Sequence, residues 1–460
     1  MVRSNSKSTF LVIFISALFS WIEIDAQVLD NYVTEGLKNN IVLQQKSISL
    51  DYAIYSLKIA RSYFLPSVNF QGNYTSGEGG RYIPLPLGDL MNPVYSTLNQ
   101  LTGSNSFPSI ENKEISFFPN NFYDARVKTT LPIVNTDIYY NKRIQQQQVK
   151  LREYEVEVYK RELVKNIKTS YYNYLSAMTA VQIYSKATDI LNENVRVNEK
   201  LIENGKGLRA TLLRSQSERE KVMVQFNNAE NDERNAKKYF NFLLNKDFDL
   251  EISVANSFED NVADSLMNTL FLINDSSREE LMMLKTGENI SNTVVKMSQS
   301  YIVPKISAFL DLGSQSEDWK FNNKSRYYLA GVQVDFPIFN GGKNSYKTRQ
   351  SMLDYKNAQL NYENNKNQLR LAYESAKSNL SSAWHAYKAS QLQLKSAQSF
   401  FKLIDKSFKE GANSLIEFLD ARNQLTSAEL MANLSKYKVM IEMAVLERES
   451  ASYHYNTDKK

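Results

Sequence analysis

The sequence predicts a mainly helical protein that is built from two copies of one structural unit and also contains four β-strands. Two observations support this fold class. The second half of the chain repeats landmarks of the first, and apolar residues follow helix and strand periods in separate segments. Leu131-Pro132-Ile133-Val134-Asn135 corresponds to Phe336-Pro337-Ile338-Phe339-Asn340, and Asn204-Gly205 corresponds to Glu410-Gly411 at nearly the same offset. A duplicated unit whose long middle segment keeps its length is typical of a duct or a strut.

Four segments alternate between apolar and polar residues, as β-strands do when their two faces meet different surroundings. Each is about ten residues long, the length that a tilted strand needs to cross an outer membrane with its apolar side toward lipid. Four strands cannot close a barrel, so their insertion in a membrane requires several chains to share one. The apolar sets are Val68, Phe70, Gly72 and Tyr74; Tyr123, Ala125, Val127, Thr129 and Leu131; Ile306, Ala308, Leu310 and Leu312; and Tyr328, Ala330, Val332, Val334 and Phe336.

Long helices account for most of the remaining chain. Residues 137–204 and 345–409 contain no proline, and at about 1.5 Å per residue the first forms a rod of roughly 100 Å. Each rod turns at a glycine, Gly205 or Gly411, and a second helix returns over 208–244 or 414–450. Shorter helices are expected over 29–62 and 277–300. Residues 77–121, rich in Gly, Pro, Asn and Ser, and 313–324 are predicted to be surface loops.

The N-terminus and the composition narrow the class of protein. A basic start, an apolar run from Phe10 to Ile22 and the small Ala26 predict a signal peptide over 1–26. No later segment has the 18 or so apolar residues of a membrane-spanning helix. The chain has no cysteine, and its 55 basic and 50 acidic residues alternate along the helices, which argues against nucleic acid as a partner. We find no catalytic constellation around its two histidines, and the sequence predicts no enzyme, cofactor or metal site.

Three motifs resemble those of the TolC family of outer-membrane efflux ducts, and the order of elements does so over essentially the whole mature chain. The first motif runs from Ala60 to Leu65-Pro66-Ser67-Val68, and the second from Val332 to Asn340 with Gly341-Gly342 after it. The third and most specific is Phe408-Lys409-Glu410-Gly411-Ala412-Asn413-Ser414-Leu415-Ile416-Glu417-Phe418-Leu419-Asp420-Ala421.

The resemblance implies a homotrimer in which long helical hairpins form an α-barrel and four strands per protomer form a twelve-stranded membrane β-barrel. The channel would lie in outer-membrane lipid with its helical part in the periplasm. It would provide passive exit for substrates that an inner-membrane transporter delivers through a periplasmic adaptor protein, in efflux or type I secretion. We expect a first repeat over 27–245, an equatorial linker over 246–276, and a second repeat with the C-terminal tail over 277–460.

The same resemblance suggests a periplasmic gate at the hairpin tips, where Gly205, Gly411 and Ser414 form the turns. Three copies of Glu417 and of Asp420 would ring the narrow end and favour cations. The alternative is that both acids only stabilise the start of a helix through its dipole. The family often locks this tip with an acid, an arginine and a tyrosine, but Thr211, Asn413 and Phe408 occupy those positions here. Arg209 and Arg214 are candidates to replace the lock by pairing with Glu410 or Glu417.

One function of a different class also stays open. Helical periodicity alone is typical of a coiled-coil spacer, and the four strands can form exposed hairpins on a soluble core. The runner-up is therefore an exported coiled-coil structural or adaptor protein without a membrane barrel. Against it, the rest of the chain is long helix and offers no separate apolar layer to cover the strands.

Overall fold

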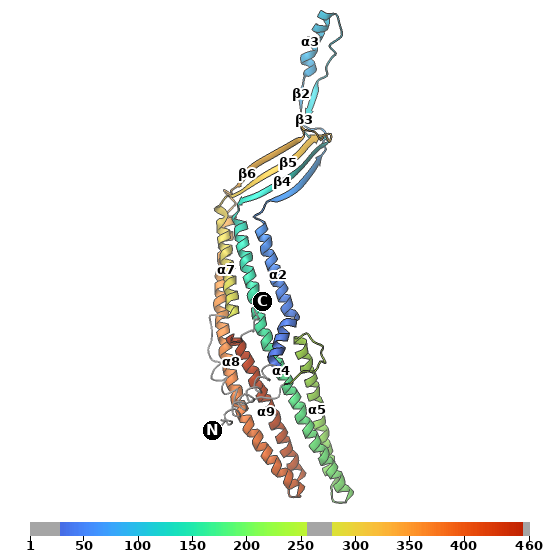
Figure 1. The fold of residues 1–460 in the computed structure, drawn as a ribbon, viewed down its shortest axis with the longest axis vertical. Helices are drawn as coiled ribbons and strands as arrows, with labels where there is room; N and C mark the ends of the chain where they lie inside the picture. The colour runs from blue at the N-terminus through green and yellow to red at the C-terminus, as the bar shows by residue number, and fades with distance from the viewer. Residues whose placement is uncertain (1–27, 255–277, 454–460) are drawn as a thin grey trace, which may run out of the picture. The chain divides into compact units, whose positions relative to one another are not determined.

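The computed structural model describes residues 28–254 and 278–453 (Figure 1). The predicted signal peptide and residues 255–276 of the predicted linker lie outside this part. The described chain forms two compact units: Tyr55–Gln146 with Asn292–Leu353 make one, and the other described residues make the second. Both halves of the sequence contribute to each unit, and the division of the chain into repeats stays a prediction.

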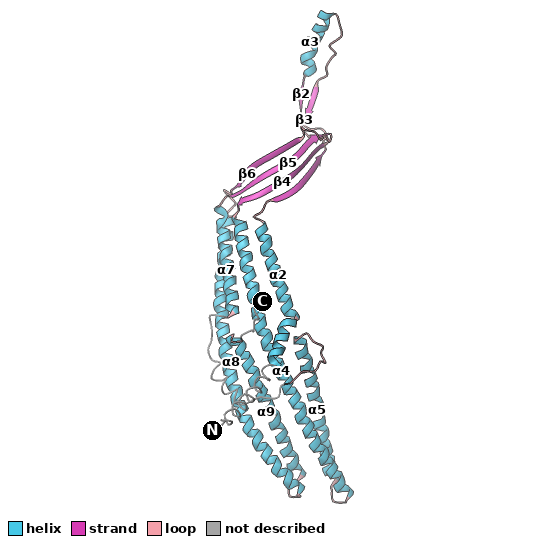
Figure 2. Cartoon of the chain, in the orientation of Figure 1, coloured by secondary structure: helices cyan, strands magenta, loops and turns pink. Residues whose placement is uncertain are grey.

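The first unit contains one antiparallel sheet of four strands in the order β1-β4-β5-β6 (Figure 2). The strands lie where the sequence predicts them, except that β5 continues through 313–317, which the sequence predicts as part of a surface loop. Their bounds are Ser67–Thr75 for β1, Phe122–Val134 for β4, Lys305–Glu317 for β5 and Arg326–Asp335 for β6. β4 and β5 pair directly, so the sheet joins one strand pair from each half of the chain.

The strand register collects the predicted apolar positions on one face of this sheet. Phe70 pairs with Val127, Val127 with Leu312, and Leu312 with Tyr328, and directly paired residues share a face. These four side chains are exposed, Phe70 to 75%. The described chain therefore leaves a wide apolar sheet surface uncovered, which soluble proteins rarely do.

Aromatic residues gather at the end of this sheet opposite to the end where β4 continues into α4. The Trp319 ring lies between Tyr74 and Tyr123, with centroid distances of 5.5 and 5.4 Å, and Phe321 lies 4.5 Å from Tyr123. The Tyr123 hydroxyl donates to the Lys320 carbonyl at 3.2 Å. Aromatic side chains with a satisfied polar end are typical of the boundary between lipid and water.

The prediction that 77–121 is only a surface loop is wrong. This insert contains strands β2, Tyr82–Leu85, and β3, Lys113–Ser116, which pair with each other, and helix α3, Leu87–Thr102. Glycines and prolines suggested a loop, but Pro93 is tolerated inside α3. Asparagine side chains of α3 also form hydrogen bonds with the backbone of residues 103–112, which we call the strap.

The long helices match their predicted positions within a few residues. The described helices run over Ile41–Ser62 (α2), Thr136–Glu203 (α4), Arg209–Leu243 (α5), Glu279–Gln299 (α7), Lys343–Lys409 (α8) and Leu415–Ser450 (α9), with a 3-10 turn at Ser300–Ile302. The continuous helix predicted over 29–62 is interrupted at Asn40. Its buried amide donates to the Leu243 carbonyl at 3.0 Å and accepts from the Tyr159 hydroxyl at 3.1 Å. In the described part of the chain we find no helix suited to cross a bilayer.

The second unit has separate apolar cores along its two helical hairpins, α4–α5 and α8–α9. In α4, Leu163, Ile167 and Tyr171 follow a spacing of four and pack with Phe240 and Leu244 at the end of α5. The seam of α8, including Ala376 and Leu380, packs with Val439 and Leu446 of α9. The three-and-four spacing in the sequence thus identifies the buried stripes of both rods.

A network of ion pairs ties α4, the start of α7 and the end of α9 together. Arg161 holds Glu279 with two bonds of 2.6 Å, and Arg278 donates to the Glu449 carbonyl at 2.7 Å. Arg448 contacts Glu162 at 3.2 Å, Glu280 at 3.2 Å and Glu449 at 2.8 Å. Burial alone would raise the pKa of Glu162, but Lys165 and Arg448 lower it below its usual 4.5.

This lowered pKa predicts an acid-sensitive contact. A carboxyl group whose pKa is lower in the folded protein stabilises it above the unfolded pKa, and the benefit is lost as pH falls through the folded value. We expect the unfolding temperature in detergent to fall as pH drops below about 4.5, and to fall less in Glu162→Gln. Identical pH profiles for both proteins, followed by circular dichroism, would contradict this assignment.

Candidate functional site

The two hairpin tips are built by the same backbone motif. Gly205 and Gly411 adopt left-handed φ values of 69° and 78°, which a residue without a Cβ accepts at no cost. Gly205 N–H donates to the Ile202 carbonyl at 2.9 Å and Lys206 N–H to that of Leu201 at 2.8 Å, which is a Schellman turn. At the second tip, the N–H groups of Gly411 and Ala412 make the corresponding bonds of 3.0 and 2.8 Å. Both long helices therefore end at defined positions.

Glu417 and Asp420 lie exposed in the first turns of α9, directly after the second tip. Glu417 forms a capping box with Ser414: its carboxylate accepts from Ser414 N–H at 2.7 Å, and its own N–H donates to Ser414 Oγ at 3.3 Å. Asp420 accepts a bond of 2.7 Å from Gln424. The bonds from Ser414 and Asn413 lower the pKa of Glu417. Glu417 therefore stabilises the helix start, and it also presents a persistent negative charge there.

The three positions that replace the lock residues do not meet in one cluster. Phe408 stacks on Phe418 at 4.7 Å and belongs to an apolar cluster. Thr211 lies in the first turn of α5, where its carbonyl accepts from Ser215 Oγ at 3.0 Å. Asn413 donates its side chain to Glu417.

The suggested arginine replacements stand apart from the acids within one chain. Arg209 and Arg214 are both exposed on α5. Among the described residues, neither forms an ion pair with Glu410 or Glu417 at 4 Å or less.

Apolar side chains from both hairpins meet above the tips. Ala187 and Leu191 of α4 and Val222 of α5 pack with Phe418 and Leu419 of α9. This cluster joins the first hairpin to the second inside one chain. It places α5 and α9 close enough for their polar residues to interact.

A buried ion pair beside this cluster was not found from the sequence. Arg422 of α9 is 1% exposed, and its Nη2 lies 3.5 Å from Oε1 of Glu218 on α5, which is 6% exposed. Asn423 bridges them, accepting from Arg422 at 2.8 Å and donating to Glu218 at 3.2 Å. Burial lowers the pKa of Arg422, while Glu218 opposes that effect. The only signal in the sequence was an arginine between apolar positions of a returning helix.

The polar face of the four-stranded sheet carries its own charged cluster. Arg126 lies 3.6 Å from Asp124 and 3.9 Å from Asp311, and its Nε donates to Gln71 at 3.2 Å. The Tyr327 hydroxyl donates to Asp124 at 2.8 Å. Paired charges of both signs suit a water-filled surface. In the described residues no group of histidine, aspartate and glutamate side chains is arranged to hold a metal ion.

A comparison with known protein families identifies the family to which this chain belongs. The model of the family described as outer membrane efflux protein matches residues 33–245 and 276–448, which include both hairpins and all four strands of the large sheet. The chain belongs to the outer membrane efflux protein family. This efflux protein therefore lies in the outer membrane, with its helical part in the periplasm.

Individual relatives agree with this assignment. The outer membrane efflux protein BepC of Brucella suis is 22% identical over 258 residues, 55% of each chain, so the alignment spans about half of that relative. The CmeC outer membrane channel of Campylobacter jejuni superposes with a TM-score of 0.75 at 18% identity, covering 94% of this efflux protein and 87% of CmeC. The open-state MtrE channel of Neisseria gonorrhoeae gives 0.70 at 14% identity, with coverages of 92% and 88%. At these identities the structural matches show the fold.

Proposed function

We propose that the chain forms a homotrimeric channel-tunnel that gives passive exit to substrates, which an inner-membrane transporter supplies through a periplasmic adaptor protein. The observation that carries the proposal is the open sheet. Its outer strands β1 and β6 have no further strand partner in the described chain, and its apolar face is exposed. In lipid both edges must be paired, and three copies would pair them as one closed sheet of twelve strands.

The assembly itself provides the first test. Size-exclusion chromatography with light scattering in detergent should give a mass of three chains. A monodisperse monomer that keeps its β-signal in circular dichroism would overturn the proposal. The coiled-coil alternative makes the opposite prediction for extraction, because a protein without a barrel should leave the outer membrane in a high-salt wash.

We further propose that Glu417 and Asp420 line the narrow periplasmic end of the trimer. Threefold symmetry would place three copies of each acid around one axis and create a negative ring that favours cations. The exposure of both side chains beside the tip supports this role. Closing contacts by Arg209 and Arg214 would then run between neighbouring protomers, since neither pairs with the tip acids within one chain.

Single-channel recording in planar bilayers tests the ring. Asp420→Asn removes three charges per trimer, so cation preference and block by multivalent cations should both weaken, and Glu417→Gln with Asp420→Asn should weaken them further. The control is Ser414→Ala, which removes a hydroxyl of the capping box and leaves every charge in place. We expect its selectivity to match the parent. Unchanged selectivity in the double variant would place the narrowest point elsewhere.

A further inference from the structure

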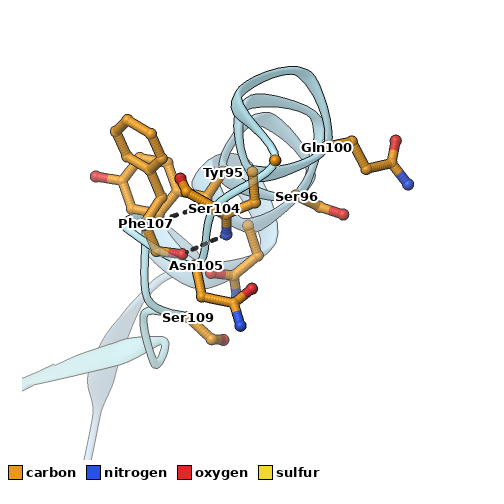
Figure 3. Close-up of a pocket in the computed structure, with 10 residues that line it drawn as sticks. Tyr95, Ser96, Gln100, Ser104, Asn105, Phe107 and Ser109 are labelled. Carbon is orange, nitrogen blue, oxygen red and sulfur yellow. Dashed lines mark hydrogen bonds between the residues drawn. The ribbon is translucent and has the colours of Figure 1, made fainter.

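Helix α3 has one face that is already covered by its own chain. Asn92 exchanges hydrogen bonds of 3.0 and 2.8 Å with the backbone of Ile110, and Asn99 exchanges bonds of 2.8 and 3.1 Å with that of Phe107. The Tyr95 ring lies 5.6 Å from the Phe107 ring. Helix and strap border an open hollow of about 640 Å³. Figure 3 shows residues that line it, among them Tyr95 of the helix and Phe107 of the strap. The strap thus holds α3 as an ordered element and covers this side.

An adjacent face of the helix carries an apolar stripe that is largely exposed in the described chain. We call it the α3 seam, and it consists of Leu87, Met91, Val94, Leu98 and Leu101. The spacing of four, three, four and three residues is the heptad pattern that brings helices together in a coiled coil. Val94 is 50% and Leu101 78% exposed, although both are apolar.

The charges on α3 favour its own copies as the partner. Asp89 is the one charged residue of the helix, and it accepts a 3.0 Å bond from Asn112 on the side of the strap. Around a threefold axis each side chain meets copies of itself. Charged side chains would therefore repel their own copies, whereas the uncharged apolar side chains of the seam can pack against theirs. A lipid surface is a poorer match, because helices that lie on membranes carry Lys and Arg on their polar face.

Topology places the insert at the outer mouth of the proposed channel. It connects Thr75 of β1 to Phe122 of β4, at the opposite end of the sheet from the point where β4 continues into α4. Twelve strands spaced about 4.8 Å apart and tilted by about 40° form a barrel of about 12 Å radius. The four-residue strands β2 and β3 span about 13 Å, so an arm of this length reaches the axis.

We propose that the α3 helices of three copies pack through their seams into a three-helix bundle that covers the outer mouth of the channel. This inference rests on the proposed homotrimer. It assigns a partner, two further copies of the same chain, to a surface that the barrel and the periplasmic helices do not use. The bundle would make passage through the outer end depend on separation of the three helices.

Cysteine cross-linking tests the bundle directly, because the chain has no cysteine of its own. Val94→Cys lies in the seam, and Ser96→Cys is a matched control on the far side of α3, where the side chain is also exposed. After mild oxidation of intact outer membranes, Val94→Cys should give at least about tenfold more disulfide-linked dimer than Ser96→Cys, since a disulfide requires Cα atoms within about 7 Å. Three cysteines at one axis can form only one disulfide, so dimers but no trimers should appear.

The remaining outcomes separate this inference from the proposed function. A trimer in detergent without a Val94→Cys dimer, or with equal dimer from Ser96→Cys, overturns the bundle and leaves the channel proposal intact. A Val94→Cys adduct with a different protein, or labelling by a lipid-soluble maleimide in place of cross-linking, also overturns it. A monomeric protein overturns both proposals.

Discussion

Glu218→Ala should lower the free energy of unfolding of the helical unit by about 3 to 5 kcal/mol, because it leaves the buried charge of Arg422 without its partner. Arg422 is almost fully enclosed, and its Nε and Nη1 already have no hydrogen-bond partner among the described residues. Without Glu218, the guanidinium group keeps only its bond to Asn423. Denaturation by urea in detergent, followed by the helical circular dichroism signal, measures the change.

Two variants make this test specific. Glu220→Ala removes the same charge from the same helix, but Glu220 is exposed and its pair with Arg219 lies at the surface, so we expect a change within about 0.5 kcal/mol. Replacing Glu218 and Arg422 together by leucine and methionine should recover much of the loss, because no buried charge then remains unpaired. Equal effects of Glu218→Ala and Glu220→Ala would show that the pair is open to water.

The helices and the large strands were predictable because their signals are long and periodic. The rods of α4 and α8 show three-and-four spacing over many turns, and the strands alternate between lipid-facing and water-facing chemistry. Neither pattern depends on contacts distant in the sequence. The break at Asn40 does depend on such contacts, since its amide bonds to Leu243 and Tyr159.

The insert and the tip site were less predictable for the same physical reason. The asparagines of α3 favour turns locally and so predict a loop, whereas in the structure they bind the backbone of the strap. The pairing of Arg422 with Glu218 joins residues from the two halves of the chain across a helix interface. A single sequence contains no record of that proximity, so only the fold reveals it.

Val332→Arg should impair insertion and cost about 2 to 4 kcal/mol in the membrane, because its side chain lies on the apolar face of β6, where a charge would meet lipid. Val332 pairs with Ala308, and Ala308 with Leu131, so the arginine would enter a continuous apolar row. In the described chain Val332 is 63% exposed, so in the proposed barrel its side chain would meet lipid. Outer-membrane yield and heat resistance of the trimer on gels report the loss.

The neighbouring residue supplies the matched control for this prediction. Gln333 follows Val332 in the same strand, so its side chain points to the opposite face, which is the face that carries the charged cluster of Arg126 and Asp311. An arginine there would meet water in the lumen, and Gln333→Arg should insert and assemble like the parent. Because the two substitutions differ only in the face they reach, equal damage from both would mean that the sheet does not separate lipid from water.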